Sequence, residues 1–90
     1  MYNIWYSSKF KKDLKKVIKR GYDINKMKTV IELLRSGQSM PEQYKDHSLT
    51  GNWVSHRECH ISPDWLLIYK IDNNDLVLTL TRTGTHSDLF

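Results

Sequence analysis

The chain has 90 residues and a formal net charge of +4, a length that suits one domain around one hydrophobic core. Its one cysteine excludes an internal disulfide framework, and no apolar run is long enough for a signal peptide or a transmembrane helix. We therefore expect residues 1–90 to form a single soluble domain that works in the cytoplasm without contact with a membrane.

The charge is distributed unevenly along the chain. Residues 1–36 contain ten Lys or Arg and three Asp or Glu, whereas residues 37–90 contain four and seven. A basic first third attracts polyanions such as nucleic acid. The alternative interpretation is a solvated, lysine-rich helix face, and charge alone does not separate the two.

The first 36 residues predict a short strand and two amphipathic helices. Residues 3–6 suit a strand, and Ser7 can cap the following helix by accepting from a free amide of its first turn. That helix ends near Gly21, and a second one begins at Asp23 and stops at Gly37. One apolar stripe of the first helix consists of Phe10, Leu14, Val17 and Ile18.

The pattern then changes to a polar loop at 38–52 and to strands. We expect strands at 53–60, at 65–69 and at 76–82, with a hairpin turn between the last two. In the last strand, alternation places Arg82 on the same side as the leucines that precede it.

This order of elements predicts an α+β fold. Two N-terminal helices pack on one face of a small, mostly antiparallel sheet of four to five strands, and a short turn or helix ends the chain. The opposite face is left open, and the polar side chains of the strands must lie there.

The histidines are the first candidates for chemistry because all of them lie in the second half. They are His47, His56, His60 and His86. A zinc site at His56, Cys59 and His60 fails on spacing, since on a strand the two histidines lie about 13 Å apart and the cysteine faces the other side. Zinc ligands must all lie about 2.0–2.3 Å from the ion. We therefore expect neither a metal nor another cofactor.

The same residue types suit RNA cleavage by attack of a 2′-hydroxyl. That reaction needs a base, an acid for the departing 5′ oxygen and cations around the phosphate. Histidine transfers protons near neutral pH, arginine binds phosphate through paired donors, and an aromatic ring can stack on an unpaired base. The spacing alone does not show that these side chains converge.

Three segments carry a family resemblance. Residues 44–53 read Tyr-Lys-Asp-His-Ser-Leu-Thr-Gly-Asn-Trp, residues 57–69 read Arg-Glu-Cys-His-Ile-Ser-Pro-Asp-Trp-Leu-Leu-Ile-Tyr, and residues 82–90 read Arg-Thr-Gly-Thr-His-Ser-Asp-Leu-Phe. In this order they resemble the YafQ-type toxins of the RelE superfamily, the toxin halves of bacterial type II toxin–antitoxin pairs.

The resemblance implies a set of active-site positions. The matching residues are His47, His60, Asp64, Arg82, His86 and Phe90. By this carry-over, His86 is the general acid, Arg82 stabilises the phosphate and Phe90 holds RNA near the scissile bond. The other three share the base and positioning roles. Glu58 is a further candidate for the base, and the sequence does not choose among these four.

Two further residues are candidates for contact with the substrate, and two of the active-site candidates could instead have a structural role. Arg57 and Trp65 flank the acidic candidates and are expected to contact substrate, although Trp65 also suits the core. Arg82 could instead pair with Asp64 or Asp88 as a structural group, and His86 could serve only to cap the last strand.

In function, the resemblance implies a metal-independent mRNA endoribonuclease that halts translation, acts in association with the ribosome and is neutralised by a cognate antitoxin. The toxin alone is expected to be a monomer. The alternative is a non-catalytic module that binds RNA or the ribosome, or a degenerate toxin that acts through its antitoxin.

Overall fold

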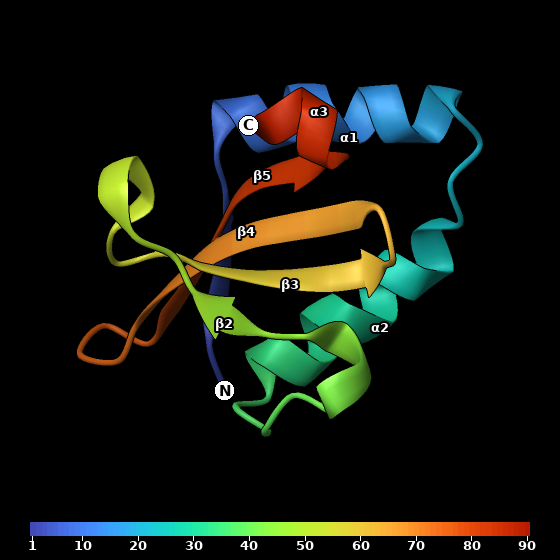
Figure 1. The fold of residues 1–90 in the computed structure, drawn as a ribbon. Helices are drawn as coiled ribbons and strands as arrows, with labels where there is room; N and C mark the ends of the chain where they lie inside the picture. Colours follow the sequence, from blue (N-terminus) through green and yellow to red (C-terminus); the bar gives the residue numbers. More distant parts are fainter.

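A computed structural model describes all residues from Met1 to Phe90 (Figure 1). In chain order the helices and strands are β1 (Asn3–Tyr6), α1 (Ser8–Lys19), α2 (Ile24–Arg35), β2 (His47–Ser48), β3 (Arg57–Ser62), β4 (Trp65–Asp72), β5 (Val77–Gly84) and α3 (His86–Leu89). Two 3-10 turns, η1 (Glu42–Tyr44) and η2 (Gly51–Trp53), flank β2. No helix is both long and apolar enough to cross a membrane.

The strands form one five-stranded sheet in the order β1-β5-β4-β3-β2. Strand β1 runs parallel to β5, and the other three pairs of neighbours are antiparallel. The expected α+β fold, with two N-terminal helices and a mostly antiparallel sheet, is therefore confirmed, and the chain ends in the short helix α3.

Both long helices begin at the predicted caps. The Ser7 hydroxyl accepts a hydrogen bond from the Phe10 amide at 2.9 Å, and the Asp23 carboxylate accepts one from the Asn25 amide at 3.0 Å. Between the helices, Gly21 has a φ of +79°, a left-handed conformation that glycine adopts at little cost. These local signals set where α1 and α2 begin and where the chain turns between them.

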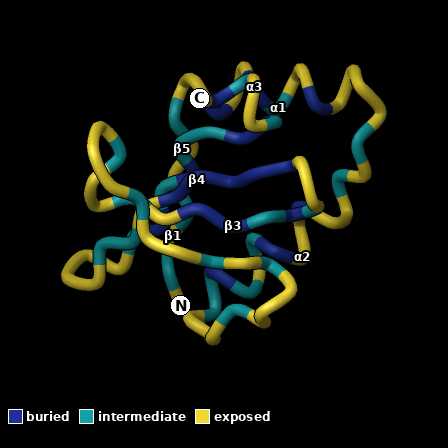
Figure 2. Tube along the Cα trace, viewed as in Figure 1, coloured by how far each residue is buried: buried dark blue, intermediate teal, exposed yellow.

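One face of the sheet packs against α1 and α2. Figure 2 shows the centres of β3 and β4 as the buried middle of the molecule. The core on this face consists of Phe10, Val17, Met27, Val30, Leu34, Cys59, Ile61, Trp65, Leu67, Tyr69, Leu78 and Leu80. Burial of this apolar surface is the main source of stability in so small a domain.

The opposite face is not fully open, which corrects the sequence-based expectation. Leu66 and Ile68 of β4 are fully buried there under Leu89 of α3, with Leu49 and Trp53 packed around them. Strand β4 is therefore covered on both faces, as its continuous apolar run predicted. Polar side chains occupy the part of this face that the small cluster leaves uncovered.

The first strand of the meander begins later than predicted. Residues Gly51–Trp53 form the turn η2, Ser55 adopts a φ of +72°, and β3 starts only at Arg57. Trp53 packs against the small cluster, so the chain must turn before the strand begins. His56 therefore lies outside the strand, edge-on to the Trp53 ring at 5.5 Å.

A β-bulge at Thr81 changes the direction of the last side chains of β5. Leu80 pairs with Tyr69 and Arg82 pairs with Ile68, so Thr81 has no partner on β4. One extra residue reverses the alternation of a strand. The predicted alternation was wrong at this point: Leu80 joins the core under the helices, whereas Arg82 faces the other side of the sheet.

Beyond the bulge, Asp13 of α1 binds the end of β5. Its carboxylate accepts from Arg82 Nε at 2.7 Å, from Arg82 Nη2 at 3.1 Å and from the Thr83 amide at 3.1 Å. Asp13 is only 5% exposed. The suggestion that Arg82 pairs with Asp64 or Asp88 is therefore wrong, because its partner comes from α1.

Replacement of Asp13 by alanine should destabilise the fold. The change leaves the Arg82 guanidinium and the Thr83 amide without their acceptor, which costs about 3 kcal/mol for a largely buried pair. Urea unfolding measures the loss. Asp75→Ala removes the same charge from an exposed turn and should stay within about 0.5 kcal/mol of the parent; equal losses in the two variants would show that Asp13 is not an anchor.

Candidate active site

Three histidine rings lie in a row on the face opposite the long helices. The ring centroids of His47 and His60 are 6.5 Å apart, and those of His60 and His86 are 5.9 Å apart. The Phe90 ring continues the row, 6.4 Å from His86. Segments far apart in the sequence, β2, β3 and the C-terminus, therefore meet at one place.

A buried carboxylate lies beneath this row. The Glu58 side chain is 5% exposed, and its Oε1 lies 3.5 Å from His47 Nε2 and 3.8 Å from His60 Nε2. Strand pairing explains the arrangement, since His47 is the register partner of Glu58 on β2. A carboxylate removed from water requires polar or cationic partners, and the two imidazoles supply them.

Both ring nitrogens of His47 face acceptors. Nδ1 lies 2.8 Å from the Lys45 carbonyl oxygen, and Nε2 faces the carboxylate of Glu58. The ring therefore presents no free lone pair to a substrate hydroxyl. In this geometry His47 can hold the carboxylate in place but is poorly arranged to accept a proton.

His60 differs in that only one of its nitrogens is engaged. Nε2 faces Glu58, while Nδ1 has no hydrogen-bond partner in the structure. The side chain is 18% exposed, so the free nitrogen can be reached from the surface while the ring stays supported. Of the histidines that contact Glu58, His60 is the one arranged to accept a proton.

His86 is oriented by Asp64. Its Nδ1 lies 3.2 Å from Asp64 Oδ1, and its backbone amide donates to the same oxygen at 3.4 Å. These hydrogen bonds from His86 lower the pKa of the Asp64 carboxyl, which therefore stays ionised at neutral pH. A carboxylate beside Nδ1 favours the tautomer with a proton on that atom and leaves Nε2 free to face a ligand.

Arg82 lies on the same face as these side chains because of the bulge. The cross-strand row runs from His47 through Glu58 and Ile68 to Arg82. The hydrogen bond to Asp13 raises the pKa of Arg82. Asp13 engages Nε and Nη2, so Nη1 is the nitrogen that remains for another anion.

The C-terminal helix positions His86 and Phe90. Asp88 accepts from Arg20 at 2.6 and 3.0 Å and from the Thr85 amide at 2.9 Å, which ties α3 to the end of α1. Gly84 has a φ of +152°, and a Cβ there would lie 2.8 Å from Asp88 Oδ2. Phe90 remains 61% exposed beyond this support.

The two expected flanking substrate contacts, Trp65 and Arg57, lie outside the histidine row. Trp65 is 3% exposed, donates to Thr83 Oγ1 at 2.9 Å and packs edge-on to Tyr22, so it belongs to the core. Arg57 precedes Glu58 on β3 and therefore points to the helix side of the sheet. There it donates to Asp46 and to Ser48 at 2.7 Å each.

Asp13 and Asp46 are the polar residues near the site that the sequence did not reveal. Asp13 holds Arg82, while Asp46 binds Arg57 and the hydroxyl of Tyr69. Asp13 lies on the apolar stripe of α1, three residues after Phe10 and four before Val17, and this spacing is the signal that it is buried. No local signal distinguishes Asp46 from a surface residue.

No group of three or more His, Cys, Asp or Glu side chains is arranged to hold a metal ion. Cys59 is fully buried in the core on the helix side, and this burial raises the pKa of its thiol. It faces away from His60, as the spacing argument predicted. His56 lies in the turn before β3 and does not join the histidine row.

A family described as bacterial toxin of type II toxin–antitoxin system, YafQ, matches residues 2–90. The chain belongs to the YafQ toxin family. It is 45% identical over 89 residues to the mRNA interferase toxin YafQ of Escherichia coli strain K12, and the match covers 98% of this chain and 95% of that protein. The resemblance in the three sequence segments is thereby confirmed.

Solved structures of bacterial toxins have the same fold. The toxin in the crystal structure of the E. coli DinJ–YafQ complex superposes with a TM-score of 0.90 at 43% identity, covering 100% of this chain and 99% of that one. A metal-bound toxin from Helicobacter pylori superposes with a TM-score of 0.94 at 43% identity over the whole of both chains. The fold of this YafQ-family chain therefore matches crystal structures along its full length.

The stabilisation of α3 by the ion pair between Arg20 and Asp88 should weaken at low pH. Arg20 lowers the pKa of the Asp88 carboxyl in the folded state. The stability that this ion pair contributes is therefore fully present above the pKa of an unfolded aspartate, about 3.9, and is lost as the pH falls through the lowered pKa of the folded state. Asp88→Asn should therefore be less stable than the parent at pH 7, and the difference should shrink below about pH 4. Thermal unfolding at several pH values measures it; a difference that stays constant down to about pH 2 would contradict the role of Asp88.

Proposed function

We propose that this chain is the toxin of a type II toxin–antitoxin pair and an endoribonuclease that cleaves mRNA. The observation that supports it most is the convergence of His60, His86 and Arg82 on one face, in a chain of the YafQ family. The curated E. coli relative is an mRNA interferase toxin. Residues 1–90 act together as one toxin domain, because the site draws on strands, a helix and the C-terminus.

His86 is the proposed general acid. Asp64 accepts from its Nδ1 and fixes the orientation of the ring, while Nε2 is free to face the departing 5′ oxygen. This division of roles resembles other catalytic histidines, in which a carboxylate fixes the tautomer and the distal nitrogen moves the proton. Asp64 is already engaged by His86, so it acts through that ring and is not the base.

His60 is the proposed general base. It offers a free nitrogen, whereas Glu58 is buried and both nitrogens of His47 are engaged. Glu58 and His47 are therefore positioning residues that hold the His60 ring from beneath. The base takes the proton of the 2′-hydroxyl as the 2′ oxygen attacks phosphorus. The bond to the 5′ oxygen then breaks, and that oxygen receives a proton from His86.

Arg82 and Phe90 complete the proposed site. The free Nη1 of Arg82 provides a permanent positive charge for the phosphate as its negative charge becomes concentrated in the transition state. The exposed Phe90 ring offers a flat surface for an unpaired base, a contact worth about 1–3 kcal/mol. Each role in the reaction is thus assigned to a side chain, and no step requires a metal ion.

We infer the partners of this chain from its family and from the distribution of its basic residues. The E. coli relative forms a complex with DinJ, and we propose that a cognate antitoxin neutralises this chain in the same way. The lysines of α1 form no ion pairs, so the basic first third of the chain is free to attract ribosomal RNA as well as mRNA. We propose that the toxin works in the cytoplasm on translating ribosomes and is a monomer when the antitoxin is absent.

The second candidate is a non-catalytic module that binds RNA or the ribosome. The basic surface of α1 favours it, since exposed lysines bind nucleic acid without any chemistry. The two candidates differ in one observable: the module would bind ribosomes and leave the message intact.

Replacement of His86 by alanine should lower the rate of mRNA cleavage at least about 100-fold and abolish growth arrest, because the acid is lost. His56→Ala is the matched control, since His56 lies outside the row. Cleavage of a translated message is measured by primer extension, and circular dichroism shows that both variants fold. Full activity of His86→Ala would contradict the mechanism.

The pH dependence of cleavage should separate the acid from the base. The acidic limb of a bell-shaped kcat/KM profile reports the base and the alkaline limb reports the acid. His60→Ala should flatten the acidic limb of its residual activity, while Glu58→Gln should lower the rate and keep both limbs. If Glu58→Gln removes the acidic limb and His60→Ala retains it, the carboxylate is the base instead.

A further inference from the structure

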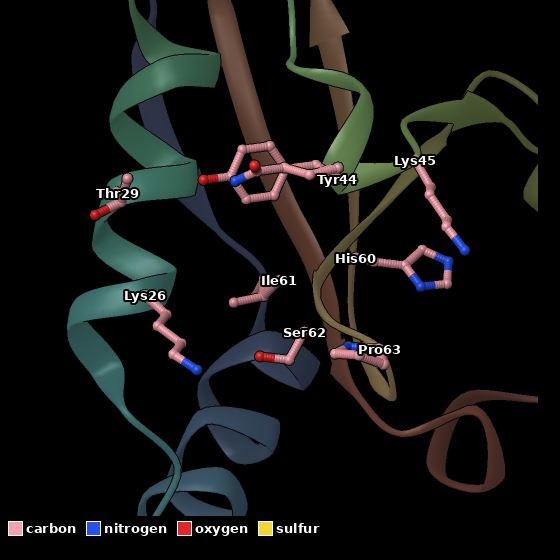
Figure 3. A pocket seen from close by; sticks show the side chains of 9 residues that line it. Lys26, Thr29, Tyr44, Lys45, His60, Ile61, Ser62 and Pro63 are labelled. Atoms are coloured by element: carbon pink, nitrogen blue, oxygen red, sulfur yellow. The ribbon is translucent and has the colours of Figure 1, made fainter.

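A cavity of about 510 Å³ opens beside His60, between α2 and the segment from η1 to β3. Figure 3 shows Lys26 and Thr29 of α2 along one wall, with Lys45 and His60 at the opposite end. The remaining lining residues are Gln43, Tyr44, Ile61, Ser62 and Pro63. None of the roles assigned to the histidine row uses this space.

The cavity is built for an anion. Lys26 and Lys45 supply two ammonium groups, and no Asp or Glu lines the space. Neither lysine takes part in any ion pair of the structure, although seven such pairs are formed elsewhere. Two unpaired cations around one polar hollow favour a negatively charged group such as a phosphate.

The rest of the lining suits the other parts of a nucleotide. Thr29, Gln43 and Ser62 carry hydroxyl and amide groups that can donate to and accept from a base or a ribose. Tyr44 and Ile61 add apolar surface deeper in the wall, where both pack against the core. Volumes of about 300–1,000 Å³ are usual for small-molecule sites.

The cavity is linked directly to the catalytic row through Lys45. Its backbone has a φ of +49°, which is uncommon for a residue other than glycine. In this conformation its carbonyl oxygen lies 2.8 Å from His47 Nδ1, while its side chain reaches the cavity. Lys45 adopts this conformation because it ends the turn η1, where its amide donates to the Glu42 carbonyl oxygen at 3.0 Å.

We propose that the cavity binds the nucleotide on the 5′ side of the scissile phosphate, and that Lys26 and Lys45, at opposite ends of the cavity, bind the RNA backbone on the two sides of that nucleotide. The assignment rests on the proposed ribonuclease function. His60, the base, must lie at the 2′-hydroxyl of the upstream nucleotide, and His60 borders the cavity. His86 and Phe90 lie at the other end of the row, where the leaving nucleotide departs. The cavity is therefore where this toxin selects the upstream base.

The test is an NMR titration of the full chain with a hexamer of 2′-fluoro RNA, which cannot be cleaved because it has no 2′-hydroxyl. The backbone amides of Thr29, Gln43 and Lys45 should shift together with those of His86 and Phe90, and with one Kd. The double variant Lys26→Gln, Lys45→Gln should raise that Kd about tenfold. The matched control Lys11→Gln, Lys15→Gln removes the same charge from α1 and should raise it less than about threefold.

Two outcomes would overturn the proposal. Shifts confined to His86 and Phe90 would show that the cavity is not a nucleotide site, and equal weakening in the two double variants would show that only overall charge matters. Cleavage of a translated mRNA by the parent protein, measured in parallel, tests the ribonuclease function separately. A parent that cuts mRNA while its cavity amides stay unshifted contradicts the cavity assignment alone.

Discussion

The β-bulge at Thr81 and the carboxylate of Asp13 together fix the direction of the last residues of β5. The Ser7 hydroxyl donates to the Thr81 carbonyl oxygen at 2.6 Å, so the residue that caps α1 also holds the bulge. Asp13, one and a half turns later on α1, then binds Arg82 and the Thr83 amide. Without the extra residue, Arg82 would point into the core beneath the helices, where an unpaired charge is prohibitively costly. The helix that carries six of the fourteen Lys and Arg residues therefore also orients Arg82.

A second constraint is the buried carboxylate of Glu58. It lies between His47 and His60, and burial without them would leave it with no compensating partner. The two imidazoles are in turn held by strands, which position side chains more rigidly than loops do. In the resulting arrangement only the Glu58 carboxylate is buried, beneath the row that His47, His60 and His86 form.

The sequence predicted those features of the fold that local patterns encode. Ser7 and Asp23 marked the helix starts, and the apolar run of β4 marked a strand covered on both faces. The bulge at Thr81 was not predictable, because strict alternation of residues 76–82 looks the same with or without it. The placement of Arg57 and Trp65 outside the histidine row was likewise not predictable from their proximity in sequence to Glu58 and Asp64, because neighbouring positions on a strand face opposite sides. The convergence of His47, His60 and His86 depends on pairing between β2 and β3 and on the support of α3, which no spacing rule contains.

In the proposed reaction a 2′-hydroxyl attacks the scissile phosphate, with protons moved by His60 and His86. The chemistry of the new RNA ends distinguishes this attack from hydrolysis by water. Mass spectrometry of the fragments released from a defined message should find a 2′,3′-cyclic phosphate, or the 3′-phosphate it hydrolyses to, and a 5′-hydroxyl on the downstream fragment. A 3′-hydroxyl paired with a 5′-phosphate would show that water attacked instead, and would contradict the roles assigned here to the histidine row.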